Sequence, residues 1–364
     1  MKMYVYVIRR LILLIPVIIG VTLITFALSH ANVSLLIAGY LGRVRTPQHI
    51  AIVKQELHLN LPVYEQYFYY LGNLFTGNWG YLAPTEVFDP GTPVVVEFQR
   101  RFPPTLELAV FATLLVFLMG LPLGVFSAVK KDRLTDQITR VIAMTGVSIP
   151  VFWFGLLILI AVGPNSILPM QLRLVGVGQI PPSYYYYPHS SILEPWVNTK
   201  VSGLTRPTGF LLIDTLLYGD WQAFLAGLYT LFWPALSVAF TSFGLIVRFL
   251  RSSMLEVMNQ DFIRTARSKG VPEYFVVRKH VRRNALGATT TVMGLFFAGL
   301  LGGVVVTETV FGWPGMGRWL FYAAIGGDMV SVMATTFVFT IVIVTANLIV
   351  DIIYSYLDPR VRLE

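Results

Sequence analysis

The sequence predicts an all-α membrane protein with six transmembrane helices and both termini in the cytoplasm. Two bulk properties indicate the membrane: only 13% of the 364 residues are charged, and the mean hydropathy is +0.67. A soluble domain carries roughly 25% charged residues, so about half of the usual charged surface is missing. The positions of the apolar stretches and of the Lys and Arg residues supply the number of spans and the orientation.

Six stretches contain no Asp, Glu, Lys, Arg or His and run for 19 to 27 residues each. At a rise of about 1.5 Å per residue, each can cross a hydrocarbon core about 30 Å thick. We expect one helix in each of the stretches 11–29, 108–129, 141–163, 221–247, 284–307 and 329–350.

The basic residues are concentrated in the segments expected on one side of the membrane. With the amino terminus inside, the pieces 1–10, 130–140, 248–283 and 351–364 hold 18 of the 27 Lys and Arg residues. This bias places both termini in the cytoplasm. The net charge of +8 is therefore explained by orientation in membrane lipid, and we expect no nucleic-acid partner.

The first span has an alternative interpretation as a cleaved signal peptide. Arg9 and Arg10 precede an apolar run, and 27–29 resembles a small-x-small cleavage site. The run has 19 residues, longer than the roughly 7–15 residues of a signal-peptide core. We expect 1–29 to remain as an amino-terminal transmembrane helix.

Two long segments are expected outside the cell, 30–104 and 164–220. Residues 51–74 mix apolar and charged side chains in a pattern suited to helices at the outer membrane surface. The second segment contains Tyr184–Tyr187, whose rings could stack on sugar faces or form an interfacial aromatic belt. The run could also form the core of a small external cap, and the sequence leaves these interpretations open.

Missing motifs exclude several classes of function. No ionisable side chain lies inside a predicted span, whereas proton-coupled carriers place one near the midplane. The chain has no G-x-x-x-x-G-K-[ST] phosphate loop, no cysteine and no metal-ligand spacing among its five histidines. We therefore predict no catalytic residue, metal or cofactor in this chain. A self-sufficient channel or secondary carrier, and a scaffold or receptor, remain as alternatives.

The longest predicted cytoplasmic segment has the most specific pattern. Ser252 or Ser253 can cap a helix through Met258, and a short helix is expected over 261–268, with Asp261 at its positive amino terminus. Gly270 should end it, and Pro272 should open another helix, through Val281. A helix held between two spans would act as a lever. The alternative is a solvated charged loop.

This segment resembles a known motif. Residues 261–270 read DFIRTARSKG and residues 278–286 read RKHVRRNAL. They are similar to the EAA loop of permease subunits in the dipeptide and oligopeptide group of binding-protein-dependent ABC importers. Further blocks that resemble the group, in order, are 9–11, 101–109, 120–124, 148–153, 308–317 and 357–362.

The resemblance implies a type I ABC importer (MetI-like) transmembrane domain in the cell membrane. The permease core would occupy 105–364, with an extracellular insertion at 164–220 and a cytoplasmic coupling loop at 252–287. It implies a second homologous permease subunit, two cytoplasmic ABC ATPases that bind ATP and Mg²⁺ and perform the hydrolysis, and an extracellular solute-binding protein. Peptides, oligosaccharides and nickel complexes are the substrates of such relatives, and the sequence does not choose among them.

The resemblance also assigns roles in the loop. Residues 261–270 would lie in a groove of an ATPase, with Asp261 at the start of the helix. Phe262 and Ala266 would be the buried contacts, and Arg264 and Arg267 would form the charged rim. Gly270 would allow the turn.

A second block, 308–317, is expected at the outer mouth of the pore. Its residues Glu308, Phe311, Pro314 and Gly315 could shape a gate or contact the solute-binding protein. Alternatively, the block is a packed re-entrant turn held by Trp313 and Pro314.

Overall fold

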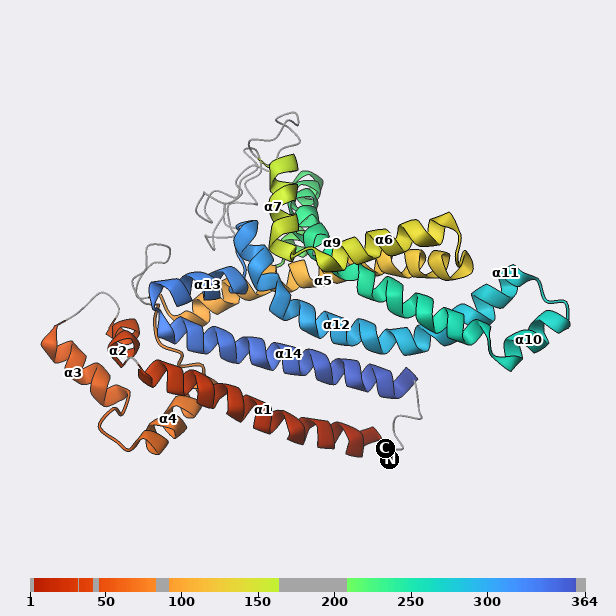
Figure 1. Cartoon of the computed structure of the whole chain (residues 1–364). Helices are drawn as coiled ribbons and strands as arrows, with labels where there is room; N and C mark the ends of the chain where they lie inside the picture. Colours follow the sequence, from red (N-terminus) through yellow and green to blue (C-terminus); the bar gives the residue numbers. More distant parts are fainter. Residues whose placement is uncertain (1–2, 32, 42–45, 83–91, 164–207, 358–364) are drawn as a thin grey trace.

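The described chain is a set of helices with no β-sheet (Figure 1). The computed structural model describes residues 3–31, 33–41, 46–82, 92–163 and 208–357. The Tyr184–Tyr187 run, most of the 164–220 segment and positions 358–362 of the last family block lie outside these residues. The helices are α1 (Met3–Ala31), α2 (Val33–Leu41), α3 (Pro47–Glu56), α4 (Val63–Thr76), α5 (Val94–Val129), α6 (Leu134–Ser148), α7 (Val151–Val162), α8 (Leu211–Leu217), α9 (Trp221–Met258), α10 (Asp261–Ser268), α11 (Glu273–Phe275), the π-helix η4 (Val276–Val281), α12 (Arg282–Val310), α13 (Met316–Gly326) and α14 (Met329–Leu357).

Four helices of the described chain, α1, α5, α9 and α14, are long and apolar enough to cross a membrane, and the bent pair α6 and α7 brings the number to five if it counts as one span. These helices contain five of the six predicted stretches. The sixth, 284–307, lies within α12, which is helical over 29 residues. The all-helical membrane architecture is confirmed, and the number of six spans stays a prediction.

The predicted span 141–163 is not one straight helix. It divides into α6 and α7, whose axes differ by 103°. Ile149 between them has extended backbone angles, φ −84° and ψ 127°. Pro150 explains the break, because proline disfavours helical geometry in the residue before it and cannot donate a backbone hydrogen bond.

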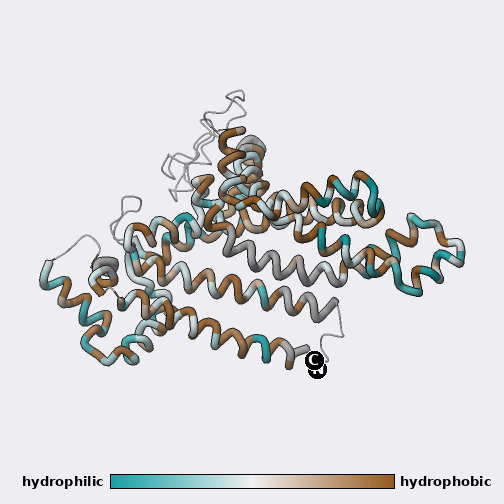
Figure 2. The backbone as a smooth tube through the Cα atoms, in the orientation of Figure 1, coloured by the Kyte–Doolittle hydropathy of each residue, from teal (hydrophilic) through white to brown (hydrophobic). Residues whose placement is uncertain are grey.

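The centre of the bundle is the long contact between α5 and α9. Small residues of α5 allow this approach: a Cβ on Gly120 would lie 3.0 Å from the Ile246 side chain, and one on Gly124 would lie 3.1 Å from Leu250. Helix α1 lies at the periphery against α14, and much of its apolar surface is exposed. Figure 2 shows apolar residues distributed along α1 and α5, as expected for helices in lipid.

The two ends of the bundle differ. The start of α1, the end of α14 and the segment α10 to η4 lie at one end (Figure 1), which we call the elbow end. Helices α2, α3 and α4 gather at the opposite end, which we call the cap end. Hydrophilic residues are concentrated in the projecting elbow (Figure 2). The cytoplasmic location of the two termini stays a prediction.

Candidate functional site

The elbow, residues 259–281, contains the short helix that the sequence predicted. Helix α10 spans Asp261–Ser268, with extended Gln260 before it and Asp261 in its first turn. Gly270 has φ +72°, a conformation that costs glycine little and other residues more. Its N–H donates to the Arg267 carbonyl at 3.0 Å. The predicted bounds of α10 and the glycine turn are confirmed.

The elbow is anchored to the bundle by an apolar cluster at the elbow end. Ile263 points into this cluster and is fully buried. The remaining buried members come from α5, α9, η4 and α12: Ala128, Leu250, Met254, Val257, Val276, Val281 and Ala285. Burying one such isoleucine stabilises the packed state by about 1.5–3 kcal/mol. Helix α10 is therefore packed directly against residues of α5, α9, η4 and α12.

Several other side chains of the elbow are exposed, and three of these are aromatic. Phe262 is 42% exposed, Tyr274 is 71% exposed and Phe275 is 43% exposed. Asp261 and Arg264, both highly exposed, form a weak ion pair at 3.4 Å. Exposed aromatic side chains with charged neighbours are typical of the centre and rim of protein interfaces.

Two residues predicted to contact a partner have contacts within the chain. Ala266 is only partly exposed and packs against the elbow cluster. Arg267 donates two hydrogen bonds to the Glu273 carboxylate, at 2.7 and 3.0 Å. These bonds join α10 to α11 across the glycine turn, and they lower the pKa of the Glu273 carboxyl from its ordinary value. Both residues therefore hold the elbow in shape.

The elbow departs from the predicted helix pattern on both sides. Helix α9 runs through Ser252 and Ser253 to Met258 without a cap, and Ser253 donates to the Ala285 carbonyl of α12. After Pro272 only Glu273–Phe275 is α-helical, and η4 follows to Val281. Helix α9 thus extends past the two serines, where it contacts α12. The π-helical turn η4 joins the elbow to α12. Short π-helical turns are rare and are often found at functional sites.

A buried ion pair fixes α9 close to the elbow. The Arg251 guanidinium donates to both oxygens of Asp136, at 2.9 and 2.8 Å. The Asp136 side chain is fully buried, and it also accepts hydrogen bonds from Ser127 and from the Asp132 N–H. This clamp connects the α5–α6 turn to α9. No local pattern in the sequence predicts this pair, because the two partners are 115 residues apart.

The 308–317 block is a packed turn at the junction of α12 and α13. Glu308 is fully buried. Its carboxylate accepts hydrogen bonds from the N–H groups of Gly317 and Arg318, at 2.7 and 3.1 Å, and so caps the amino terminus of α13. Phe311, Pro314 and Gly315 are buried as well.

Two family blocks meet at this turn. Thr105 of α5 donates to Glu308 at 2.6 Å and accepts from the Met316 N–H at 2.8 Å. The Trp313 indole donates to the Pro104 carbonyl at 3.0 Å. These contacts favour the packed-turn interpretation over an exposed docking surface. The role of the block in gating stays a prediction.

Gly315→Ala is expected to lower the melting temperature of the purified protein. A Cβ at this position would overlap the Glu308 carboxylate, and overpacking of this kind costs about 1–3 kcal/mol. Gly20→Ala is the matched control, because nothing lies within 4 Å of a Cβ on Gly20 in α1. Equal melting temperatures for the two variants would contradict the packed turn.

No group of three or more His, Cys, Asp or Glu side chains in the described ranges could hold a metal ion. The described site consists of helix contacts, three ion pairs and exposed aromatic side chains. What it can do is transmit motion between a partner bound at the elbow and the membrane helices.

The long apolar helices and the anchored elbow define a multi-pass membrane subunit of the transport class. The chain belongs to the family "Binding-protein-dependent transport system inner membrane component", which matches residues 120–363. The amino-terminal region of such membrane components, "Binding-prot-dependent transport system membrane comp, N-term", matches residues 3–109. The predicted resemblance to dipeptide and oligopeptide ABC permeases is thereby confirmed.

Relatives align over nearly the whole chain. The "Probable D,D-dipeptide transport system permease protein DdpB" of Escherichia coli K12 is 39% identical over 96% of this chain and 94% of its own length. The "Dipeptide transport system permease protein DppB" of Haemophilus influenzae is 37% identical over 99% of this chain and 100% of its own length. The "Oligopeptide transport system permease protein AppB" of Bacillus subtilis is 31% identical over 98% of this chain and 99% of its own length. The chain is thus a permease subunit of an ABC transporter.

Proposed function

We propose that this chain forms half of the translocation pore of an ABC importer for short peptides. A second, homologous permease would supply the other half. Two ATPases would bind the elbows, and a solute-binding protein would deliver the substrate at the cap end. ATP and Mg²⁺ would bind to the ATPases, which would carry out the hydrolysis. The names of the relatives support peptides, and we propose no oligosaccharide or nickel transport.

The observation that carries this proposal is the two-sided elbow. Ile263 is buried among membrane helices while its neighbour Phe262 is 42% exposed. One side of α10 is thus attached to the bundle and the other is available to a partner. We propose that the elbow end faces the cytoplasm and that Phe262, with Tyr274 and Phe275, contacts an ATPase. Closure of the ATPases would move α10 and, through the elbow cluster, the membrane helices.

The test is reconstitution of the complex in vesicles. We expect uptake of a labelled dipeptide that requires the ATPases, ATP enclosed in the vesicle on the elbow side, and the solute-binding protein in the outer solution on the cap side. Uptake without ATPases would indicate a self-sufficient channel or carrier. Stable assembly without any ATP-dependent flux would indicate a scaffold or receptor.

Phe262→Asp is expected to raise the Kd of the chain for the ATPases by about 30-fold or more, because loss of a central aromatic contact costs about 2 kcal/mol or more. Less ATPase should therefore copurify with this variant. The exposed side chain is not needed for packing, so the variant should retain the melting temperature of the parent. Phe262→Leu is the matched control and should retain most of the affinity. Normal ATPase binding by Phe262→Asp would exclude this contact.

A further inference from the structure

Helix α4 presents an apolar stripe that is largely exposed in the described part of the chain. Tyr64, Phe68, Leu71 and Phe75 follow the i, i+4, i+7, i+11 spacing and therefore share one face. Tyr64, Phe68 and Phe75 are 65–67% exposed. Glu65, in the first turn, is the only charged residue of the helix. Such a stripe needs an apolar environment.

The other side of α4 is attached to the lipid-facing helix α1, well inside its apolar stretch. Tyr67 and Thr22 share a hydrogen bond of 2.9 Å between their hydroxyls, and Tyr70 and Thr25 share one of 3.1 Å. Thr22 is nine residues from Ala31, the end of α1. At about 1.5 Å per residue, the contact lies roughly 14 Å along the helix from the cap end.

Contacts between α4 and α14 lie at a similar distance from the cap end. The rings of Phe75 and Phe337 meet edge to face with centroids 5.6 Å apart. Phe337 is eight residues from Met329, where α14 begins, which corresponds to roughly 12 Å. Half of a hydrocarbon core about 30 Å thick is about 15 Å. Helix α4 therefore lies at the depth of one leaflet rather than above the membrane.

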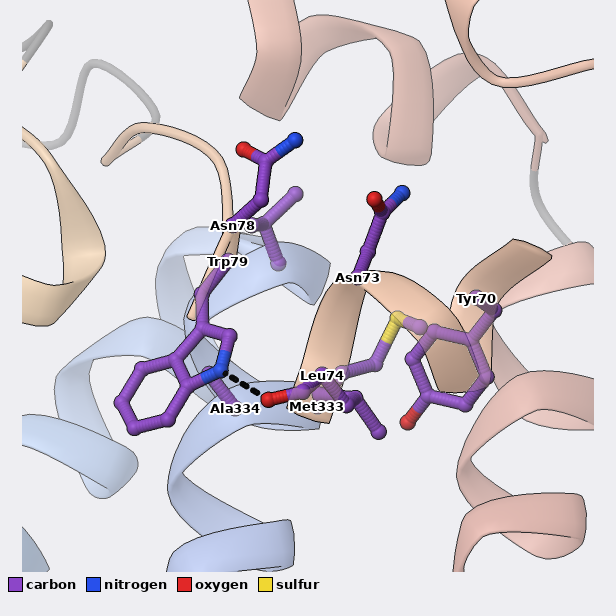
Figure 3. A pocket seen from close by; sticks show the side chains of 8 residues that line it. Tyr70, Asn73, Leu74, Asn78, Trp79, Met333 and Ala334 are labelled. Carbon is purple, nitrogen blue, oxygen red and sulfur yellow. Dashed lines mark hydrogen bonds between the residues drawn. The ribbon is translucent and has the colours of Figure 1, made fainter. Parts of the chain in front are cut away.

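Carbonyl groups at the carboxyl end of α4 accept hydrogen bonds from groups of the same chain. An apolar surrounding requires this, because it offers no water to satisfy them. The Leu74 carbonyl accepts a hydrogen bond of 2.9 Å from the Trp79 indole (Figure 3). The Asn73 carbonyl accepts from the N–H groups of Gly77 and Asn78. The space between Trp79, Tyr70 and Met333 in Figure 3 is a cavity of only about 10 Å³, so the inner face of α4 is closed.

We propose that α4 is immersed in the membrane leaflet at the cap end, with its aromatic stripe against phospholipid acyl chains. The stripe continues the lipid-facing surface of α1, where Ile19, Leu23 and Ile24 are 43–62% exposed. Helix α4 is thus an intramembrane half-helix that widens the permease within one leaflet. This inference does not depend on the transported substrate.

The test uses site-directed spin labelling of the full chain, which contains no cysteine. Phe68→Cys and Phe75→Cys are each labelled with a nitroxide in vesicles of phosphatidylcholine and phosphatidylglycerol. Collision of the label with oxygen, which partitions into acyl chains, is compared with collision with a water-soluble nickel chelate. Ile24→Cys on α1 is the lipid-exposed control, and Lys54→Cys on exposed α3 is the aqueous control.

We expect the oxygen-to-nickel collision ratio at positions 68 and 75 to match that at position 24 and to exceed that at position 54. A ratio equal to that at position 54 would place α4 in water and overturn the proposal. Low collision rates with both reagents would show that protein covers the stripe, either a second copy or a partner, and would overturn it too. Because these side chains are exposed, the variants should elute as the parent does. Tyr64→Cys provides a third position on the same stripe.

Discussion

Asp136→Asn is expected to cause the largest loss of thermal stability among single polar substitutions at the elbow end. The Asp136 side chain is fully buried, and the Arg251 side chain is only 18% exposed. Removing one partner leaves the Arg251 charge buried without its carboxylate, which costs about 3–5 kcal/mol in such pairs. The melting temperature of the detergent-purified chain measures the effect, and it should fall well below that of the parent.

The neighbouring aspartate provides a matched control. Asp132 is 72% exposed and has only a 4.0 Å ion pair with Lys131. It has φ +61°, a conformation that asparagine tolerates. Asp132→Asn should therefore leave the melting temperature within error of the parent value. Equal melting temperatures for Asp132→Asn and Asp136→Asn would exclude a stabilising clamp.

A double-mutant cycle separates the pair from its surroundings. Arg251→Gln should also destabilise the protein, because it leaves the buried Asp136 carboxylate with only the longer ion pair to the half-exposed Arg140, at 3.6 Å. The double variant should lose less stability than the sum of the two single variants, since neither charge then remains buried alone. Additive losses would show that the two side chains act independently.

Local signals in the sequence predicted the parts of the elbow that local chemistry controls. The start of α10 at Asp261 and the turn at Gly270 follow from a charge at a helix amino terminus and from a residue that accepts positive φ. The continuation of α9 past Ser252 and the π-helical turn at Val276–Val281 were not predicted. Both depend on packing of α9 against α12, which no local pattern contains.

Contacts between distant segments account for the other differences. The Asp136–Arg251 pair and the Thr105–Glu308 hydrogen bond join residues 115 and 203 positions apart. A single sequence contains no information on such pairings. In contrast, the bend at Pro150 was predictable in principle, because proline inside an apolar stretch is a known break. The prediction of one helix over 141–163 gave more weight to hydropathy than to this residue.

Only one of the three exposed aromatic residues of the elbow was predicted from the sequence. Phe262 was identified from the family motif, but Tyr274 and Phe275, which are also exposed, were not. The available signal was the aromatic pair Tyr274–Phe275, two residues after Pro272, in a loop rich in charged residues. Ile263 was also missed as the anchor, although its neighbours in the motif were assigned roles.

Gly270→Pro is expected to abolish ATP-driven uptake while the membrane helices still insert. Proline fixes φ near −65°, whereas Gly270 has φ +72°. It also removes the N–H that donates to the Arg267 carbonyl. The turn can then no longer direct α11 back toward the bundle, so α10 would lose its fixed position relative to α12. In reconstituted complexes, ATP hydrolysis should continue and dipeptide uptake should fall to background.

Two further variants decide whether the elbow transmits this motion. Ala266→Asp places a carboxylate against the apolar elbow cluster and should uncouple hydrolysis from uptake in the same way, because burying an unpaired charge there is costly. Gly270→Asn is the matched control, since asparagine adopts positive φ more readily than other side-chain-bearing residues, and it should retain most of the uptake. If Gly270→Pro and Ala266→Asp both transported at the parent rate, α10 could not be the element that carries motion from the ATPases to the pore. Within the chain, nothing lies within 4 Å of a Cβ at position 270. If Gly270→Asn abolished uptake as completely as Gly270→Pro, the added side chain would therefore have to clash with a partner and not with the turn itself.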